Sequence, residues 1–200
     1  EFRRVLFRSK TVGAQTFNDA VVVGTAAVAP ATVGVTQFIS TTNGVITFNS
    51  TLDGSNDVTI TTAGNTTFNG KVGDSTPLTS LTTDAPGTTY INGGLIQTTS
   101  TQTFNDAVVV GTAATEFKST TAGDITFAKT LDGAQAVTIT TAGSTIFNGK
   151  VGDSTPLTSL TTDAPGTTYI NGGLIQTTST QTFNDAVVVG TAATEFKSTT

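Results

Sequence analysis

Aspartate is the only side chain frequent enough in this 200-residue sequence to supply metal ligands or acid–base catalysts. Eleven aspartates and three glutamates make up the acidic residues, histidine and cysteine are absent, and all three arginines lie near the N-terminus, at positions 3, 4 and 8. Polysaccharide lyases and hydrolases need clustered carboxylates together with a basic group that stabilises developing charge. The residue types therefore predict that the chain is not an enzyme.

Asp53 and Asp57 are the most suggestive aspartates, because their segment DGSND has a faint likeness to the calcium-binding nonapeptide GGxGxDxUx. The first glycine pair is missing, and the corresponding later segment, DGAQA at 132–136, has no counterpart of Asp57. We therefore interpret these aspartates as turn formers. The other paired aspartates stand beside Gly, Ala-Pro or Asn, which also favours turns: Asp74/Asp153, Asp84/Asp163 and Asp106/Asp185. We expect no catalytic, cofactor-binding or metal-binding residue.

Residues 1–9, EFRRVLFRS, match nothing later in the chain and resemble the translation of a common sequencing adaptor. We expect them to be a non-native leader and exclude them from the fold. Without them the chain keeps 9 − 3 = 6 basic and 14 − 1 = 13 acidic side chains, so its net charge changes from −5 to −7. Such an acidic chain lacks the positive surface that nucleic acid and anionic membranes require.

Two further properties of the composition exclude classes of protein. The most apolar run, Ala20–Val35, is shorter than the ~20 residues needed to span a bilayer, so we expect no membrane insertion. The absence of cysteine excludes disulfides and thiolate metal sites.

An internal repeat organises residues 10–200, for which we predict one continuous domain. Two units, 41–119 and 120–198, are related by an offset of 79, and the segment from Phe68 to Thr121 recurs unchanged at 147–200. A partial unit at 15–40 carries an insertion at 28–35. Short threonine- and valine-rich segments separated by turn signals predict strands, and anchors about 20 residues apart predict stacked coils. The predicted fold is all-β, a parallel β-solenoid.

A five-residue box recurs along these coils as a large ring, usually Asn, a small residue and then an aliphatic side chain. Its copies begin at Phe17, Phe48, Phe68, Phe104, Phe127, Phe147 and Phe183. We predict that each ring points inward and stacks on the ring of the next coil. We expect the Asn, and Gly70 or Gly149 after it, to adopt left-handed backbone at a corner. Ser50 is replaced by Lys129 in the second unit, which predicts an outward position there.

The interval between Tyr90 and Phe104 is short for a coil. Either that coil is reduced, or Tyr90 is not the equivalent of the phenylalanines.

The segments 66–94, 102–114 and 124–143 resemble, in style and composition, the repeats of very large bacterial surface adhesins of the filamentous-haemagglutinin-like and autotransporter-like kind. The resemblance implies a right-handed parallel β-helix that a Gram-negative bacterium secretes or displays on its outer surface. It implies no functional residues or cofactor. We expect the chain to be an internal piece of such a protein.

The predicted function is a stalk or adhesion surface that contacts a host surface, glycan or matrix, or associates with itself through the solenoid ends. Two alternatives remain open: a fragment of a β-helical polysaccharide lyase or hydrolase, and a threonine-ladder ice-binding protein. The TxT segments at Thr59–Thr61 and Thr138–Thr140 have the local form of an ice-binding face. The other coils do not repeat TxT in phase, so the required array is not expected.

Overall fold

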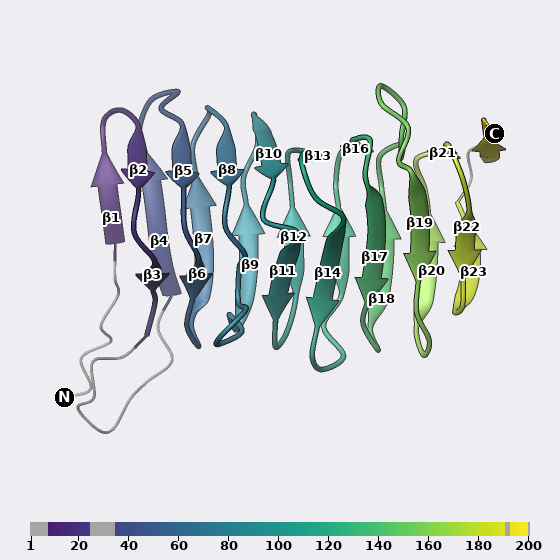
Figure 1. The fold of residues 1–200 in the computed structure, drawn as a ribbon, viewed down its shortest axis with the longest axis horizontal. Coiled ribbons are helices and arrows are strands. Elements are labelled where there is room, and N and C mark those ends of the chain that lie inside the picture. Colours follow the sequence, from purple (N-terminus) through teal and green to yellow (C-terminus); the bar gives the residue numbers. More distant parts are fainter. Residues whose placement is uncertain (1–7, 25–34, 191–192, 200) are drawn as a thin grey trace.

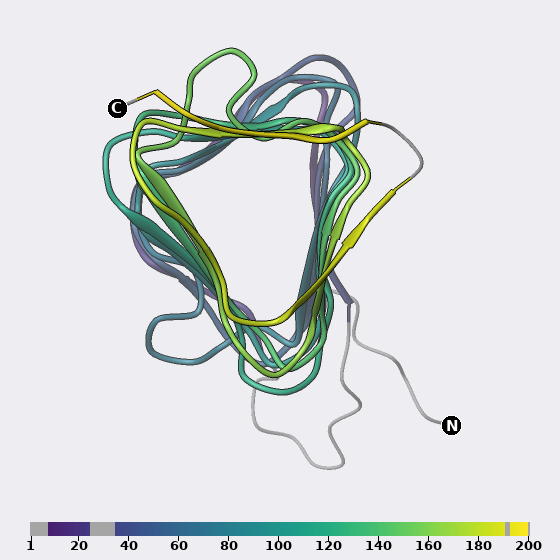
Figure 2. The ribbon, with the colours of Figure 1, turned by 90° about the vertical axis from the view of Figure 1, so that its right-hand side faces the viewer.

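The protein is a right-handed parallel β-solenoid of triangular cross-section, as shown by a computed structural model that describes residues 8–24, 35–190 and 193–199. Successive turns are about 22 residues apart, and no helix occurs among the described residues. In Figure 2 the C-terminal end faces the viewer and the chain approaches counterclockwise, which defines the right hand. The predicted fold class is confirmed, with coils slightly longer than the anchor spacing predicted.

Three walls of parallel strands enclose the core (Figure 1). Wall A consists of β1 (Arg8–Thr11), β4 (Val35–Ser40), β7 (Asp57–Thr61), β9 (Ser80–Thr83), β12 (Gln102–Phe104), β15 (Ile125–Phe127), β18 (Ser144–Phe147), β20 (Thr167–Ile170) and β23 (Ala186–Val189). Wall B consists of β2 (Gln15–Phe17), β5 (Ile46–Phe48), β8 (Thr66–Phe68), β10 (Thr88–Ile91), β13 (Ala107–Val110) and β16 (Leu131–Asp132), continued through Val151 to β21 (Leu174–Thr177) and β24 (Glu195–Ser198). Wall C consists of β3 (Val21–Val22) and β6 (Leu52–Asp53), continued through Val72 to β11 (Leu95–Thr98), β14 (Thr115–Ser119), β17 (Ala136–Thr140), β19 (Ser159–Thr162) and β22 (Gln181–Phe183).

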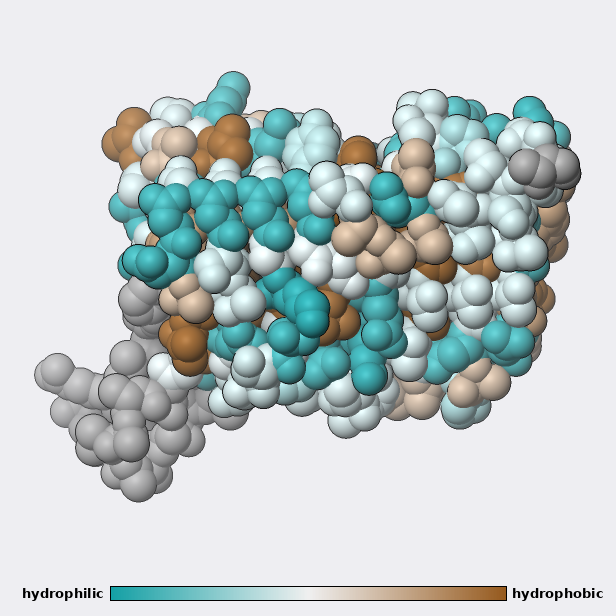
Figure 3. All heavy atoms as spheres, in the orientation of Figure 1, coloured by the Kyte–Doolittle hydropathy of each residue, from teal (hydrophilic) through white to brown (hydrophobic). Residues whose placement is uncertain are grey.

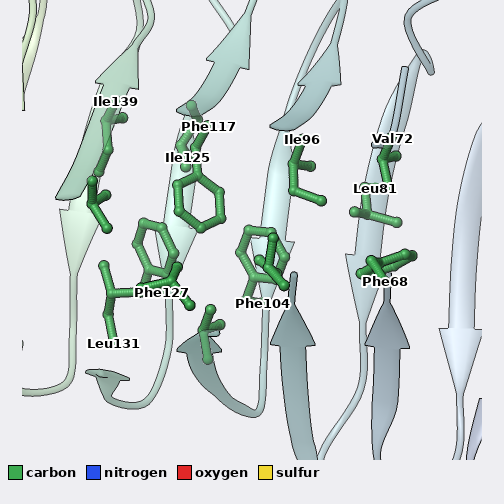
Figure 4. Close-up of a cluster of buried hydrophobic side chains, with 14 of the residues drawn as sticks. Phe68, Val72, Leu81, Ile96, Phe104, Phe117, Ile125, Phe127, Leu131 and Ile139 are labelled. Carbon is green, nitrogen blue, oxygen red and sulfur yellow. The ribbon is translucent and has the colours of Figure 1, made fainter. Parts of the chain in front are cut away.

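Alternation along each strand places one set of side chains in the core, as the period-2 pattern predicts. Phe104, Phe127 and Phe147 form one aromatic stack on wall A, with ring centroids 5.4 and 5.5 Å apart. Figure 4 shows the Phe104 and Phe127 rings of this stack. Phe17, Phe48 and Phe68 form the equivalent stack on wall B, with centroids 5.0 and 5.4 Å apart. The prediction that the box rings stack from coil to coil is confirmed for both of these stacks.

Two further rings that the box pattern did not mark complete these stacks. Phe38 packs edge-on against Phe17 and Phe48, and Phe117 packs in the same way against Phe104 and Phe127. Both Phe38 and Phe117 are fully buried. Each ring lies in the strand of a neighbouring wall, so these edge contacts join two walls across the core.

The repeat unit is out of phase with the three-walled turn. Because turns are about 22 residues apart, the offset of 79 between units is close to three and two-thirds turns rather than a whole number. Consequently β10 belongs to wall B, whereas its identical copy β20 belongs to wall A. The Phe68 strand β8 and the Phe147 strand β18 are displaced in the same way. Each unit is therefore turned by one wall relative to the unit before it.

The corner asparagines stabilise the solenoid in a different way from the one predicted. Among the described residues only glycines have positive φ, so the expected left-handed asparagines are wrong. Instead, the side-chain amides of Asn49, Asn69 and Asn92 each donate to the Asn oxygen one coil earlier, at 2.8 Å, beginning at Asn18. We call this row the asparagine ladder. Hydrophilic side chains form a row along this part of the surface in Figure 3.

Gly70 and Gly149 were also predicted to be left-handed, and neither has positive φ. Glycine is required at these positions because the backbone of the preceding coil lies very close. A Cβ on Gly70 would lie 2.3 Å from the carbonyl carbon of Ser50. A Cβ on Gly149 would meet the Lys129 backbone at the same distance. Absence of a side chain lets the coils stack here without a bulge.

The short interval after Tyr90 has a simple explanation. Phe68 pairs in register with Ile91, and Tyr90 pairs with Thr67. Ile91 is fully buried and Asn92 follows it, so the box of this coil is Ile91-Asn92-Gly93 and Tyr90 faces outward. The second of the two alternatives is correct: Tyr90 is not the equivalent of the phenylalanines.

Predictions for Lys129, the insertion and the leader can also be compared with the structure. Lys129 is exposed at its corner, as the exchange with Ser50 predicted. Most of the insertion at 28–35 lies outside the described residues. The leader was excluded up to residue 9, whereas Arg8 and Ser9 form part of β1 and pair with Gln37 and Phe38. None of the described elements is a helix that could cross a membrane.

Candidate functional site

The aspartates of the DG turns hold a projecting loop. The carboxylate of Asp53 accepts backbone N–H bonds from Ser75 and Thr76 at 2.9 and 3.3 Å. Asp132 binds Ser154 and Thr155 in the same way. Asp57 instead accepts a hydrogen bond from the Ser80 hydroxyl at 2.6 Å, so Asp53 and Asp57 bind different segments of the chain. In the part of the chain that the structure describes, no three acidic side chains gather as a metal site would require.

The loops held in this way, 73–77 and 152–156, share the sequence GDSTP and project from different corners of the triangular outline (Figure 2). Lys71 forms an ion pair with Asp74 at 3.0 Å at the base of the first loop, and Lys150 pairs with Asp153 at 2.9 Å in the second. Gly73 and Gly152 begin the loops at φ +73°. The two loops are thus identical, exposed and separated by one repeat unit.

Asp106 lies at the bend between β12 and β13, as its sequence context predicted, but its burial was not predicted. Its side chain points into the corner between walls A and B and is only 3% exposed. The Thr83 hydroxyl donates to Oδ1 at 2.8 Å, and the Thr89 hydroxyl lies 2.8 Å from Oδ2 and 3.0 Å from Oδ1. We call Asp106, Thr83 and Thr89 the aspartate cage.

Burial dominates the electrostatics of the cage. It raises the pKa of Asp106 above the usual 3.8, against the opposing effect of the hydrogen bonds from Thr83 and Thr89, and the negative charge of Asp84 adds to the rise. Burial also raises the pKa of Asp84, whose Oδ1 accepts the Thr62 N–H at 2.9 Å. Two neighbouring carboxyl groups therefore both resist ionisation in the folded chain.

The second copy of the cage lies in a more open coil. Asp185 accepts the hydroxyls of Thr162 and Thr168 with nearly the same distances, from 2.8 to 3.0 Å. However, Asp185 is half-buried, because no coil among the described residues packs against it from the C-terminal side. The same residues thus occur once inside the stack and once at its end.

The C-terminal coil exposes residues whose counterparts lie in the core. Phe196 is 48% exposed and Val189 52%, whereas Phe117 and Val110, one unit earlier, are 0% and 1% exposed. Phe183 and Phe196 keep their edge-on contact at 5.8 Å, but no ring equivalent to Phe127 packs against them among the described residues. Four of the eight exposed large hydrophobic side chains among the described residues lie in this coil: Val187, Val188, Val189 and Phe196.

The outer surface of wall A carries an in-register row of threonines. Pairing aligns Thr59 with Thr82, Thr82 with Thr103, and Thr103 with Thr126. The row then continues as Ile146, Tyr169 and Val188. Beside Thr59 and Thr82, the outward positions two residues earlier hold Asp57 and Ser80, so a second threonine rank does not form there. Unequal spacing between successive threonines hides this row in the sequence.

Comparisons with known proteins provide no relatives. No protein-family profile, curated protein or solved structure matches the chain.

Proposed function

We propose that this chain is a structural or adhesive repeat segment of a large secreted or cell-surface protein of a Gram-negative bacterium. It acts there as a stalk or as an adhesion surface. The observation that carries the proposal is the solenoid stack itself. Coils follow one another about every 22 residues, and the walls continue without a break from one repeat unit into the next. Such a fold lengthens by adding coils, since each coil contacts only its neighbours.

The side walls support a role at a polar interface. In Figure 3 hydrophobic atoms form separate spots on the face shown rather than one broad patch. The threonine row, the asparagine ladder and the GDSTP loops supply hydrogen-bonding groups along the rod. A partner that binds these walls would be a polar surface such as a glycan or a matrix protein.

The threonine row on wall A gives one alternative a specific observation. Four threonines in register favour binding to a regular surface such as ice, although the outward positions two residues before Thr59 and Thr82 hold Asp57 and Ser80 instead of threonine. Measurable thermal hysteresis would support that alternative. Turnover of a polyuronate would instead support the lyase or hydrolase alternative.

Surface display is tested in the source bacterium. Antibodies raised against the purified chain should label intact cells, and external protease should remove the label. Labelling that requires cell lysis would contradict the proposal. Glycan and matrix-protein arrays then separate the two roles, because a stalk binds none of the probes. For an adhesive segment, Asp74→Ala combined with Asp153→Ala tests the loops, and Asp19→Ala, at another exposed aspartate, is the surface control.

A further inference from the structure

The aspartate cage lies at the contact between two coils, and no ion pair among the described residues reaches it. Asp106 lies between β12 and β13, whereas Thr83 ends β9 and Thr89 lies in β10, one coil earlier. A Cβ added to Gly87, between the two threonines, would lie 3.9 Å from Oδ2 of Asp106. The carboxyl group therefore fills the inside of the corner that the preceding coil forms.

The charged groups around the cage do not neutralise it. Asp84 is in the same corner and carries the same charge. Lys129 lies at the matching position of the following coil, because Phe104 pairs with Phe127 and the chains run in parallel from there. However, Lys129 is exposed, and the ion pairs formed by described residues join other groups: Lys71 with Asp74 and Lys150 with Asp153. Strands β9, β10, β12 and β13 contain no other ionisable side chain than Tyr90, which faces outward.

We propose that the aspartate cage is an acid-strengthened latch between coils, so that the solenoid resists unfolding better in a mildly acidic medium than at neutral pH. When Asp106 is ionised, a buried negative charge is balanced only by two neutral hydroxyls. When it takes up a proton, the charge and its repulsion of Asp84 disappear. The carboxylic acid keeps an acceptor oxygen for the threonines and gains an O–H that the hydroxyl lone pairs can accept.

The sign of the effect follows from linkage. A carboxyl group whose pKa is higher in the folded chain than in the unfolded chain binds more protons when folded, between those two values. The free energy of unfolding therefore rises as the pH falls through the folded pKa, and the gain is complete below the unfolded value near 3.8. Paired carboxylates whose pKa is lowered by folding have the opposite effect, because they lower the free energy of unfolding as the pH falls. The latch is independent of which partner the walls bind.

The repeat supplies a matched control within one molecule. Asp106 and Asp185 have the same sequence neighbours and the same two threonine donors, but only Asp106 is enclosed by coils on both sides. Asp106→Asn imitates the neutral acid, and Asp185→Asn makes the same chemical change at the open end. Denaturant midpoints of the full chain and both variants should be measured at pH 7.5 and pH 4.5.

In the Asp106→Asn protein we expect a higher midpoint than wild type at pH 7.5 and a smaller gain on going to pH 4.5. Asp185→Asn should shift the midpoint less at both values. An Asp106→Asn protein with the same pH response as wild type would overturn the latch.

A direct titration keeps the proposal testable if a variant fails to fold. The 13C signal of the Asp106 carboxyl group in the wild-type chain should titrate with a midpoint above 3.8, and Asp84→Asn should lower that midpoint by removing the neighbouring charge. A midpoint at or below 3.8 in the wild-type chain would refute the proposal.

Discussion

Asn69 donates its side-chain amide to the side-chain oxygen of Asn49 at 2.8 Å, across the gap between two coils. Asn92 in turn donates to Asn69, and Asn49 to Asn18, so each interior asparagine both gives and accepts one bond. In the second unit Ala128 takes the place of Asn49, and only the Asn171–Asn148 link, also at 2.8 Å, remains of the corresponding row. The ladder is thus continuous in one unit and interrupted in the next.

Removal of one rung should weaken the first unit measurably. Asn69→Ala breaks two links, and each neutral hydrogen bond contributes roughly 0.5–1.5 kcal/mol. We expect the free energy of unfolding to fall by about 1–2 kcal/mol, since the groups are exposed and water replaces part of the loss. Conversely, Ala128→Asn gives Asn148 an acceptor and should stabilise the chain by a fraction of that amount. Urea unfolding of both proteins checks the pair, and a destabilising Ala128→Asn would contradict the ladder interpretation.

The inward rings should dominate the stability of the core. Phe68 is fully buried and stacks on Phe48 at 5.4 Å, so Phe68→Ala should lower the free energy of unfolding by about 3–5 kcal/mol. Tyr90 is the control, because it is aromatic, lies on the next coil and faces outward. Tyr90→Ala should cost less than about 1 kcal/mol. Thermal unfolding followed by circular dichroism distinguishes the two, and equal losses would refute the assignment of inward and outward faces.

Close approach of the coils predicts which glycines accept a methyl group. Gly70→Ala would place Cβ 2.3 Å from the Ser50 carbonyl carbon and should destabilise the chain by roughly 1–3 kcal/mol through forced backbone displacement. At Gly13 nothing lies within 4 Å of an added Cβ. Gly13→Ala should therefore leave the unfolding midpoint nearly unchanged. If Gly70→Ala were as stable as Gly13→Ala, the coils could not be packed as tightly as the structure describes.

The apolar C-terminal coil should cause association of the isolated chain. Unpaired strand edges and exposed core residues favour contact with another copy. Phe196→Ser removes a ring that is 48% exposed at this end, and Tyr169→Ser removes one that is 36% exposed on the side wall. Sedimentation velocity should show concentration-dependent association that Phe196→Ser reduces and Tyr169→Ser does not. An equal effect of both substitutions would place the contact on the side walls.

Two features that the sequence predicted correctly depend on one coil at a time. Inward rings such as Phe68 follow from strand alternation, and the exposure of Lys129 follows from the cost of burying an unpaired charge. The asparagine ladder, the threonine row and the aspartate cage depend instead on which residue lies above which. To predict that alignment, one would have needed the true coil length. One would also have needed to know that Ile91, and not Tyr90, is the inward residue equivalent to Phe68.

The candidate site illustrates the same limit. Asp106 stands in FNDAV beside an asparagine, a context typical of turns, and nothing local indicates burial. Its donors, Thr83 and Thr89, are 23 and 17 residues away in the chain, in the preceding coil. A periodicity of about 22 residues, applied to polar as well as apolar side chains, would have aligned Thr83 with Asp106. Thr89 pairs in register with Val108, two residues after Asp106, so the period alone would not have identified it.

Because the repeat unit is not a whole number of solenoid turns, equivalent surface features follow a helical path around the rod. A GDSTP loop recurs one wall further round with each unit, so a flat partner lying along one side would meet an equivalent loop only at every third unit. A rod of many such units would offer the same chemistry in every direction around its axis and would need no particular rotation to engage a surface.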